Sequence, residues 1–173
     1  EKTFLDSYIK RITYYKQLGD QTFEQLHEID FQYQFNEESN SIAIIIQHLA
    51  GNMLSRFTNF LTEDGEKEWR KRDTEFDDQH MSKEQLLHRW EEGWACFLGA
   101  VQSLTEADLE KTITIRTEEL TVVDALNRQL AHYPYHVGQI VYIGRMIQNK
   151  SWKNLSIPKG TSNQFNQSMK TKH

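Results

Sequence analysis

The chain contains little cysteine, which crosslinks small folds, and little glycine and proline, which interrupt helices. Its one cysteine, Cys96, excludes an internal disulfide framework and a multi-cysteine zinc site, and it is consistent with a reducing compartment. Only 8 glycines and 2 prolines occur among 173 residues. An all-β sandwich needs many tight turns and therefore more of both residues. The composition favours long helices, and we expect an all-α protein.

The chain also lacks a basic surface signature and a long apolar segment. Its net charge is −5, and lysines and arginines form no stripe interleaved with aromatics, so nucleic acid is not expected as a partner. The longest stretch without charged side chains, 39–55, contains Gln47, His48 and Asn52 and does not predict a membrane span. The N-terminal residues lack the apolar core of a signal peptide. We expect a cytoplasmic protein without nucleic-acid or membrane partners.

Apolar residues recur at helical spacing in four long segments: 3–29, 41–61, 83–104 and 122–149. Before the last of these, Ile113 and Ile115 alternate with polar residues. This alternation predicts a short hairpin of strands 112–116 and 120–122 between the third and fourth helices. We therefore predict a single domain over 1–173 that forms a four-helix bundle. Residues 151–173 are expected to form a C-terminal tail that packs on the domain or is partly flexible.

A charged connection, TEDGEKEWRKRDTEFDDQHM, joins the second and third helical segments over 62–81. It is long for a structureless loop, so we expect Trp69 and Phe76 to pack it against the helices. The charges at 71–72 are expected to be solvated. The next helix is predicted to begin at a capping box formed by Ser82 and Gln85, and the fourth at Thr121.

Three of the seven histidines lie where helices are expected to be buried. His48 lies within 39–55, and His132 and His136 lie within 129–144, the two longest stretches without charged side chains. His132 and His136 occupy successive turns at one edge of an apolar face, which places their Cβ atoms about 5–6 Å apart. His48 lies at the edge of the apolar face of its own helix. Where two such edges meet, three imidazoles can hold a divalent ion and leave positions open for water or substrate.

Each of these histidines also has a structural explanation. A lone histidine at a helix edge, such as His48, is more often a hydrogen-bonded structural residue than a ligand, and pairs four residues apart arise by chance. HYPYH is not the metalloprotease motif HExxH, because Tyr133 stands where the glutamate base would be. The sequence therefore names no catalytic base. Asn52, Gln129 and Gln139 project near the histidines and are the expected hydrogen-bond partners of the ligands.

The other reactive side chains are expected to have structural or surface roles. Cys96 has no base nearby in the sequence and is expected to be an inert packed thiol. Trp90 and Trp94, one helical turn apart, are expected in the core rather than in a stacking platform. The remaining histidines are expected at the surface or at the chain terminus: His27, His80, His88 and His173.

The motifs around the three central histidines resemble those of a known superfamily. QHLAGNM surrounds His48, HYPYHVGQI contains His132 and His136, and Gly-Gln-Ile follows this pair at 138–140. The pattern resembles the DinB-like superfamily, which includes the YfiT-like metal-dependent hydrolases. The segments DGEKEWRKRDTEF and NLSIPKG resemble one bacterial subgroup with a domain of unknown function. The resemblance covers about 1–150 at superfamily level and nearly the whole chain at subgroup level.

The resemblance implies a more specific fold and chemistry. It implies an up-down-down-up four-helix bundle, commonly a homodimer, in which His48, His132 and His136 hold a divalent metal ion. Nickel and zinc are the first candidates, followed by iron and manganese. Relatives include transferases that use a low-molecular-weight thiol such as bacillithiol. A metal on three imidazoles would lower the pKa of a bound water or thiol and present it as a nucleophile to a small-molecule substrate.

Two hypotheses from different classes follow. The first is a metal-dependent enzyme, either a hydrolase or a thiol-cofactor-dependent transferase. The alternative is a non-catalytic bundle that acts as a binding or dimerisation module and whose histidines are structural. Nucleic-acid binding, which the superfamily name suggests, fits the acidic composition poorly. The enzymatic hypothesis requires that His48 lie beside His132 and His136 in the folded chain.

Overall fold

The computed structural model describes residues 3–77 and 79–171, and in these residues the chain is mainly helical with one small sheet. This confirms the all-α class and the hairpin between the third and fourth long helices. In chain order the elements are α1 Phe4–Phe23, the 3-10 helix η1 Glu28–Gln32, α2 Ile42–Phe57, η2 Arg72–Phe76, α3 Lys83–Gln102, η3 Glu106–Asp108, β1 Thr112–Ile115, β2 Glu118–Thr121, α4 Val122–Gln148, η4 Asn149–Ser151 and α5 Ser162–Lys170.

The long helices begin where polar side chains satisfy the backbone amides of the first turn. The side-chain oxygens of Ser41, Ser82 and Thr121 each accept a hydrogen bond from the backbone amide three residues later. The Gln85 side chain completes the capping box at Ser82 by accepting from the Ser82 backbone amide. The predicted helix starts at Ser82 and Thr121 are therefore confirmed.

Two helices end earlier than the apolar spacing predicts. The first ends at Phe23 rather than at residue 29, and α2 ends at Phe57 rather than at 61. Beyond α1 the apolar side chains Leu26 and Phe31 are still buried, but η1 rather than a continued α-helix carries the chain past them. Beyond α2, Thr58 has an extended backbone with a ψ of 121°, which ends the helix, and Asn59 follows in a left-handed conformation with a φ of 51°.

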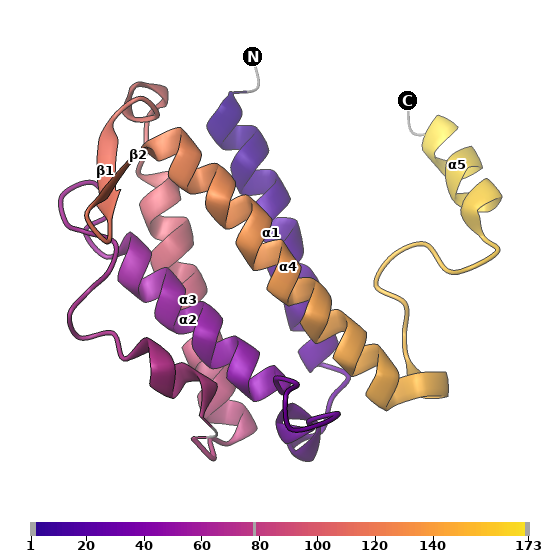
Figure 1. Cartoon of the computed structure of the whole chain (residues 1–173). Helices are drawn as coiled ribbons and strands as arrows, with labels where there is room; N and C mark the ends of the chain where they lie inside the picture. Colours follow the sequence, from indigo (N-terminus) through magenta and orange to yellow (C-terminus); the bar gives the residue numbers. More distant parts are fainter. Residues whose placement is uncertain (1–2, 78, 172–173) are drawn as a thin grey trace.

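The four long helices pack along one another, with α1 and α4 running in one direction and α2 and α3 in the opposite direction (Figure 1). α2 packs against α3, α1 packs against α4, and further contacts join α1 to α3 and α2 to α4. This arrangement brings the faces of α2 and α4 that carry the central histidines together.

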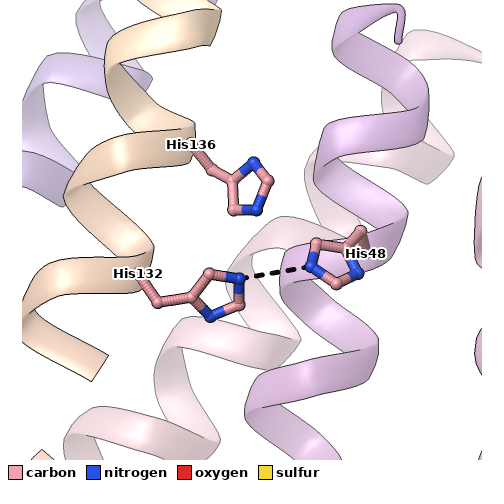
Figure 2. Close-up of side chains that lie close together, drawn as sticks. All are labelled: His48, His132 and His136. Atoms are coloured by element: carbon pink, nitrogen blue, oxygen red, sulfur yellow. Dashed lines mark hydrogen bonds between the residues drawn. The ribbon is translucent and has the colours of Figure 1, made fainter. Parts of the chain in front are cut away.

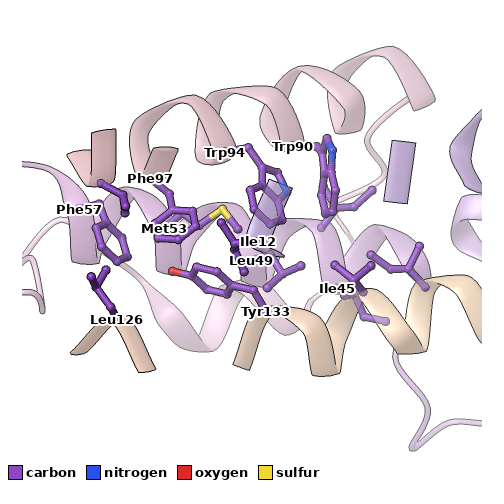
Figure 3. Packing of buried hydrophobic residues seen from close by; sticks show 14 of the residues in the cluster. Ile12, Ile45, Leu49, Met53, Phe57, Trp90, Trp94, Phe97, Leu126 and Tyr133 are labelled. Atoms are coloured by element: carbon purple, nitrogen blue, oxygen red, sulfur yellow. The ribbon is translucent and has the colours of Figure 1, made fainter. Parts of the chain in front are cut away.

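An aromatic cluster fills the core between these helices (Figure 3). Trp90, Trp94 and Phe97 extend along α3, and the ring of Phe97 packs edge-on against Tyr133 of α4 with centroids 5.1 Å apart. All four side chains are at most 1% exposed. The Tyr133 hydroxyl donates a hydrogen bond to Asn52 Oδ1 at 3.0 Å, so its polar end is satisfied within the core. The expected core position of Trp90 and Trp94 is confirmed.

The hairpin turns through two residues that are not glycine, and a neighbouring carboxylate holds them. Arg116 and Thr117 have φ values of 55° and 65°, which two-residue hairpin turns require and which side-chain-bearing residues rarely adopt. Both of their backbone amides donate to Asp64, at 2.9 and 2.8 Å, and the Glu66 amide donates to it at 2.7 Å. Asp64 therefore ties the connection after α2 to the tip of the hairpin.

These hydrogen bonds predict an acid-sensitive contribution to stability. Backbone donors, first from Glu66 and then from Thr117, lower the pKa of Asp64 from 3.8 to about 2. A carboxyl whose pKa is lower in the folded state stabilises it above about pH 4 and loses this contribution as the pH falls toward 2. We expect Asp64→Asn to lower the free energy of unfolding at pH 7 and to flatten its pH dependence between 4 and 2, measured by urea denaturation.

Glu118→Gln provides the control, because it neutralises an exposed carboxylate in the same hairpin. This variant should retain the acid dependence of the parent protein. An unchanged pH profile in Asp64→Asn would contradict the assignment.

The C-terminal segment contacts the end of α1 and then leaves the long helices. The Gln25 side chain donates to the Lys153 carbonyl at 3.1 Å and accepts from the Lys153 amide at 2.7 Å. α5 has no buried residue, and Figure 1 shows it apart from the other helices. His173 lies outside the described residues. None of the described helices is both long enough and apolar enough to cross a membrane.

Candidate metal centre

His48 of α2 and His132 and His136 of α4 come together on the side where these helices meet (Figure 2). The Nε2 atoms of His48 and His132 are 3.3 Å apart. Each imidazole offers one ring nitrogen to a set in which all three atoms lie within 4.8 Å of one another. Residues 84 positions apart in the chain thus form one cluster that could hold a metal ion.

The two histidines of α4 are held neutral by their surroundings. Burial, followed by the neighbouring imidazoles of His136 and His48, lowers the pKa of His132 from 6.5 to about 3. Burial and the proximity of His48 also lower the pKa of His136, although the hydrogen bond to Gln139 opposes part of this effect. Neutral imidazoles have a nitrogen lone pair available for a cation, so neither residue must lose a proton at pH 7 before it can bind one.

Hydrogen bonds on the far side of two rings select which nitrogen faces the cluster. Nδ1 of His48 lies 3.1 Å from Glu75 Oε2, and Nδ1 of His136 lies 2.7 Å from Gln139 Oε1. Both partners are oxygen acceptors, so in the neutral imidazole each Nδ1 carries the proton and each Nε2 keeps its lone pair. The proton positions therefore direct the Nε2 lone pairs of His48 and His136 toward the shared space.

The donor set fits a transition-metal ion rather than calcium or magnesium. Imidazole nitrogen suits zinc, nickel, copper and iron, whereas calcium and magnesium prefer oxygen ligands. Two imidazoles on a tetrahedral zinc, with bonds of about 2.0–2.1 Å, place their nitrogens roughly 3.4 Å apart. The 3.3 Å between His48 Nε2 and His132 Nε2 agrees with that spacing. Three protein ligands would leave at least one position for a water molecule or a substrate.

The three amide side chains that the sequence places near the histidines have different surroundings. Gln139 contacts His136, as described above. Asn52 is 7% exposed and accepts from the Tyr133 hydroxyl. Gln129 is 2% exposed, and its Oε1 has no hydrogen-bond partner among the described residues. The hydrogen bonds therefore link only Gln139 of this set directly to a histidine of the cluster, within the part of the chain described.

Sequence reasoning missed two charged residues beside His48. Glu75 contacts Nδ1 of His48, and Arg70 donates to both carboxylate oxygens of Glu75, at 2.8 and 2.9 Å. Burial raises the pKa of Glu75, but the hydrogen bonds from His48 and Arg70 and the charge of Arg70 outweigh this, and the pKa is lowered from 4.5. Nothing in a run of alternating charges distinguishes these two residues from their solvated neighbours, so the sequence offered no signal for them.

The charged connection packs differently from the prediction. Phe76 does pack inward, with its ring centroid 5.0 Å from that of His48. The expectation for Trp69 is wrong, because this side chain is 57% exposed. Instead, the contact of Glu75 with His48 attaches this segment to α2, and the ion pair with Arg70 holds Glu75 within the connection. His27, His80 and His88 are exposed, as predicted.

A pocket of about 420 Å³ is linked to the histidine cluster through Gln139, and its lining includes none of the three histidines. It lies between the start of α2 and the C-terminal half of α4, and Gln139 belongs both to this pocket and to the hydrogen bond with His136. Its walls are mainly aromatic and aliphatic, with a few polar groups: Tyr33, Phe35, Glu38, Ser39, Asn40, Ile45, Gln139, Tyr142, Ile143 and Met146. Its volume is within the range of small-molecule sites.

The fold and the cluster together define a helical protein with three histidines that could hold a metal ion. Residues 1–161 match the model of a family described as Protein of unknown function (DUF1572), and the chain belongs to this family. A search of curated proteins finds no match to the chain.

Proposed function

We propose that this protein is a metal-dependent enzyme whose divalent ion is held by His48, His132 and His136. The observation that carries the proposal is the approach of His48 Nε2 to His132 Nε2, at 3.3 Å, from two different helices. The lowered pKa values of His132 and His136 support it, because they favour neutral imidazoles. The acceptors on Nδ1 of His48 and His136 also support it, because they orient these two rings.

The proposed reaction is hydrolysis or thiol transfer. An ion at this site would lower the pKa of a water or a thiol, such as bacillithiol, in a remaining coordination position. Glu75 is engaged by His48 and Arg70, so its carboxylate holds a ligand in place rather than serving as a general base. Nickel or zinc is the proposed ion, with iron and manganese next, on the chemistry of three imidazole donors and on the resemblance to DinB-like proteins.

We place the small-molecule substrate in the pocket that shares Gln139 with the cluster. Its apolar walls, which include Tyr33, Tyr142 and Met146, suit an aromatic or aliphatic portion of a substrate, and Gln139 lies at the boundary with the cluster. A substrate anchored there would present its reactive group toward the open positions of the ion.

We further propose that the fold is the up-down-down-up four-helix bundle of the DinB-like superfamily, in a cytoplasmic homodimer. The directions of α1 to α4, and the packing of α1 on α4 and of α2 on α3, support this assignment (Figure 1). The association state follows from light scattering coupled to size-exclusion chromatography.

Metal content tests the central proposal. We expect protein purified without a histidine tag to carry about one equivalent of a divalent ion, and His136→Ala to lose it, as measured by elemental mass spectrometry. His88→Ala removes an exposed histidine of α3 and should retain the metal. A parent protein that is metal-free and binds no added nickel, zinc, iron or manganese would favour the alternative of a non-catalytic binding or dimerisation module.

A further inference from the structure

A buried ion pair between Arg70 and Glu75 lies on the Nδ1 side of His48, away from the other two histidines. The side chains of Arg70 and Glu75 are 2% and 10% exposed, and the Arg70 guanidinium donates hydrogen bonds to both oxygens of the Glu75 carboxylate. One of these oxygens also contacts His48 Nδ1. Charged groups are rarely this buried unless they are paired, because removing them from water is costly.

We propose that Glu75 is a positioning residue of the metal centre, which holds the His48 ring so that Nε2 points at the ion, and that Arg70 fixes Glu75 in this role. The proposal rests on the metal site of the proposed function. Metal-bound histidines usually donate their second ring N–H to a carboxylate or carbonyl, which fixes the tautomer and the ring orientation. The chain Arg70–Glu75–His48 has this arrangement, and the opposite nitrogen of His48 faces His132.

The surface of α2 leaves room for this carboxylate. Gly51 lies three residues after His48, on the next turn of the same helical face, and a Cβ atom built there would overlap the Glu75 carboxylate. A side chain at position 51 would therefore push Glu75 away from His48. Glycine destabilises a helix interior relative to alanine, and the close approach of the Glu75 carboxylate explains why it stands at this position.

The same short element fixes the ring of His48 on a second side. Phe76 follows Glu75 at the end of η2, and its ring packs against His48 with an interplanar angle of 34°. η2 thus supplies both the hydrogen-bond acceptor and the packing surface that orient this histidine. An ion pair with a purely structural role would hold Arg70 and Glu75 together within the connection but would have no effect on the tautomer of His48.

Two measurements on Glu75→Gln separate these roles. The first is zinc affinity, obtained by competition with a chromogenic chelator. We expect binding to weaken by about 10- to 100-fold, the usual effect of removing such a partner. The second is the tautomer of His48 in the metal-free protein, read from long-range ¹⁵N–¹H correlation spectra. We expect the Nδ1–H form in the parent protein and a smaller fraction of it in the variant.

Glu66→Gln is the matched control. Glu66 belongs to the same connection and pairs with Arg56 at 2.8 Å and with Arg70 at 3.8 Å, but it does not contact His48. This variant should bind zinc with the affinity of the parent protein. Gly51→Ala should reproduce the loss seen in Glu75→Gln while leaving every charged group in place. Gly138→Ala serves as its control, because a Cβ on that glycine of α4 meets nothing within 4 Å.

The outcomes distinguish this proposal from the function on which it rests. A parent protein that does not bind zinc or another divalent ion overturns the metal site and the role of Glu75 together. Normal binding by the parent, with unchanged affinity and an unchanged His48 tautomer in Glu75→Gln, overturns the role of Glu75 alone. If Glu75→Gln does not fold, Gly51→Ala decides by the same two measurements.

Discussion

Saturating zinc or nickel should raise the melting temperature of the metal-free protein by roughly 10 °C, and His132→Ala should abolish this shift. A ligand that binds only the folded state at 1,000 times its Kd adds about 4 kcal/mol of stability. In a domain of this size each kcal/mol corresponds to roughly 2–4 °C. The ion would join α2 to α4 through His48 and His132, which are 84 residues apart in the chain. Scanning calorimetry with and without the ion measures the effect.

The His132 variant also separates ligation from packing. His132 is half-buried, so its replacement by alanine changes the stability of the metal-free protein as well, and the informative quantity is the difference made by the ion. His88→Ala should keep the full shift. An equal shift in the parent protein and in His132→Ala would show that the ion binds elsewhere.

Two glycines of α3 should respond to alanine in opposite directions. Gly93 is buried against α2, where a Cβ would lie 2.8 Å from the Ala50 Cα atom and 3.2 Å from its Cβ atom. Because both elements are helix backbone, the helices must separate, and we expect Gly93→Ala to destabilise the protein by about 1–3 kcal/mol. Gly99 is exposed and a Cβ there meets nothing within 4 Å, so Gly99→Ala should stabilise the protein by roughly 0.5–1 kcal/mol.

Urea denaturation of the two variants measures both values. Since they lie on the same helix and make the same chemical change, the gain in helix propensity is common to both and the difference between them reports the contact of α2 with α3. Equal stabilities would show that the two helices lie farther apart than the structure has them.

The helix starts and the hairpin could be predicted because they depend on nearby residues. Ser82 and Thr121 cap helices through amides three residues away, and Ile113 and Ile115 show strand alternation within a few positions. The ends of α1 and α2 were placed too late because apolar residues continue past both ends, to Leu26 after α1 and to Phe60 after α2, where burial persists without an α-helix. Apolar periodicity reports burial, and backbone conformation follows it only within a regular helix.

For the candidate site, residue spacing alone indicates which helical faces carry His48, His132 and His136, because side-chain direction in a helix follows from that spacing. The meeting of these faces, and the approach of His48 Nε2 to His132, depend on how α2 packs against α4. The contact of Glu75 with His48 also depends on the tertiary structure, because η2 folds back over α2. Gly51 permits this contact, because it has no side chain to displace the Glu75 carboxylate. The path of η2 results from long-range packing and a buried ion pair, which no local pattern of residues encodes.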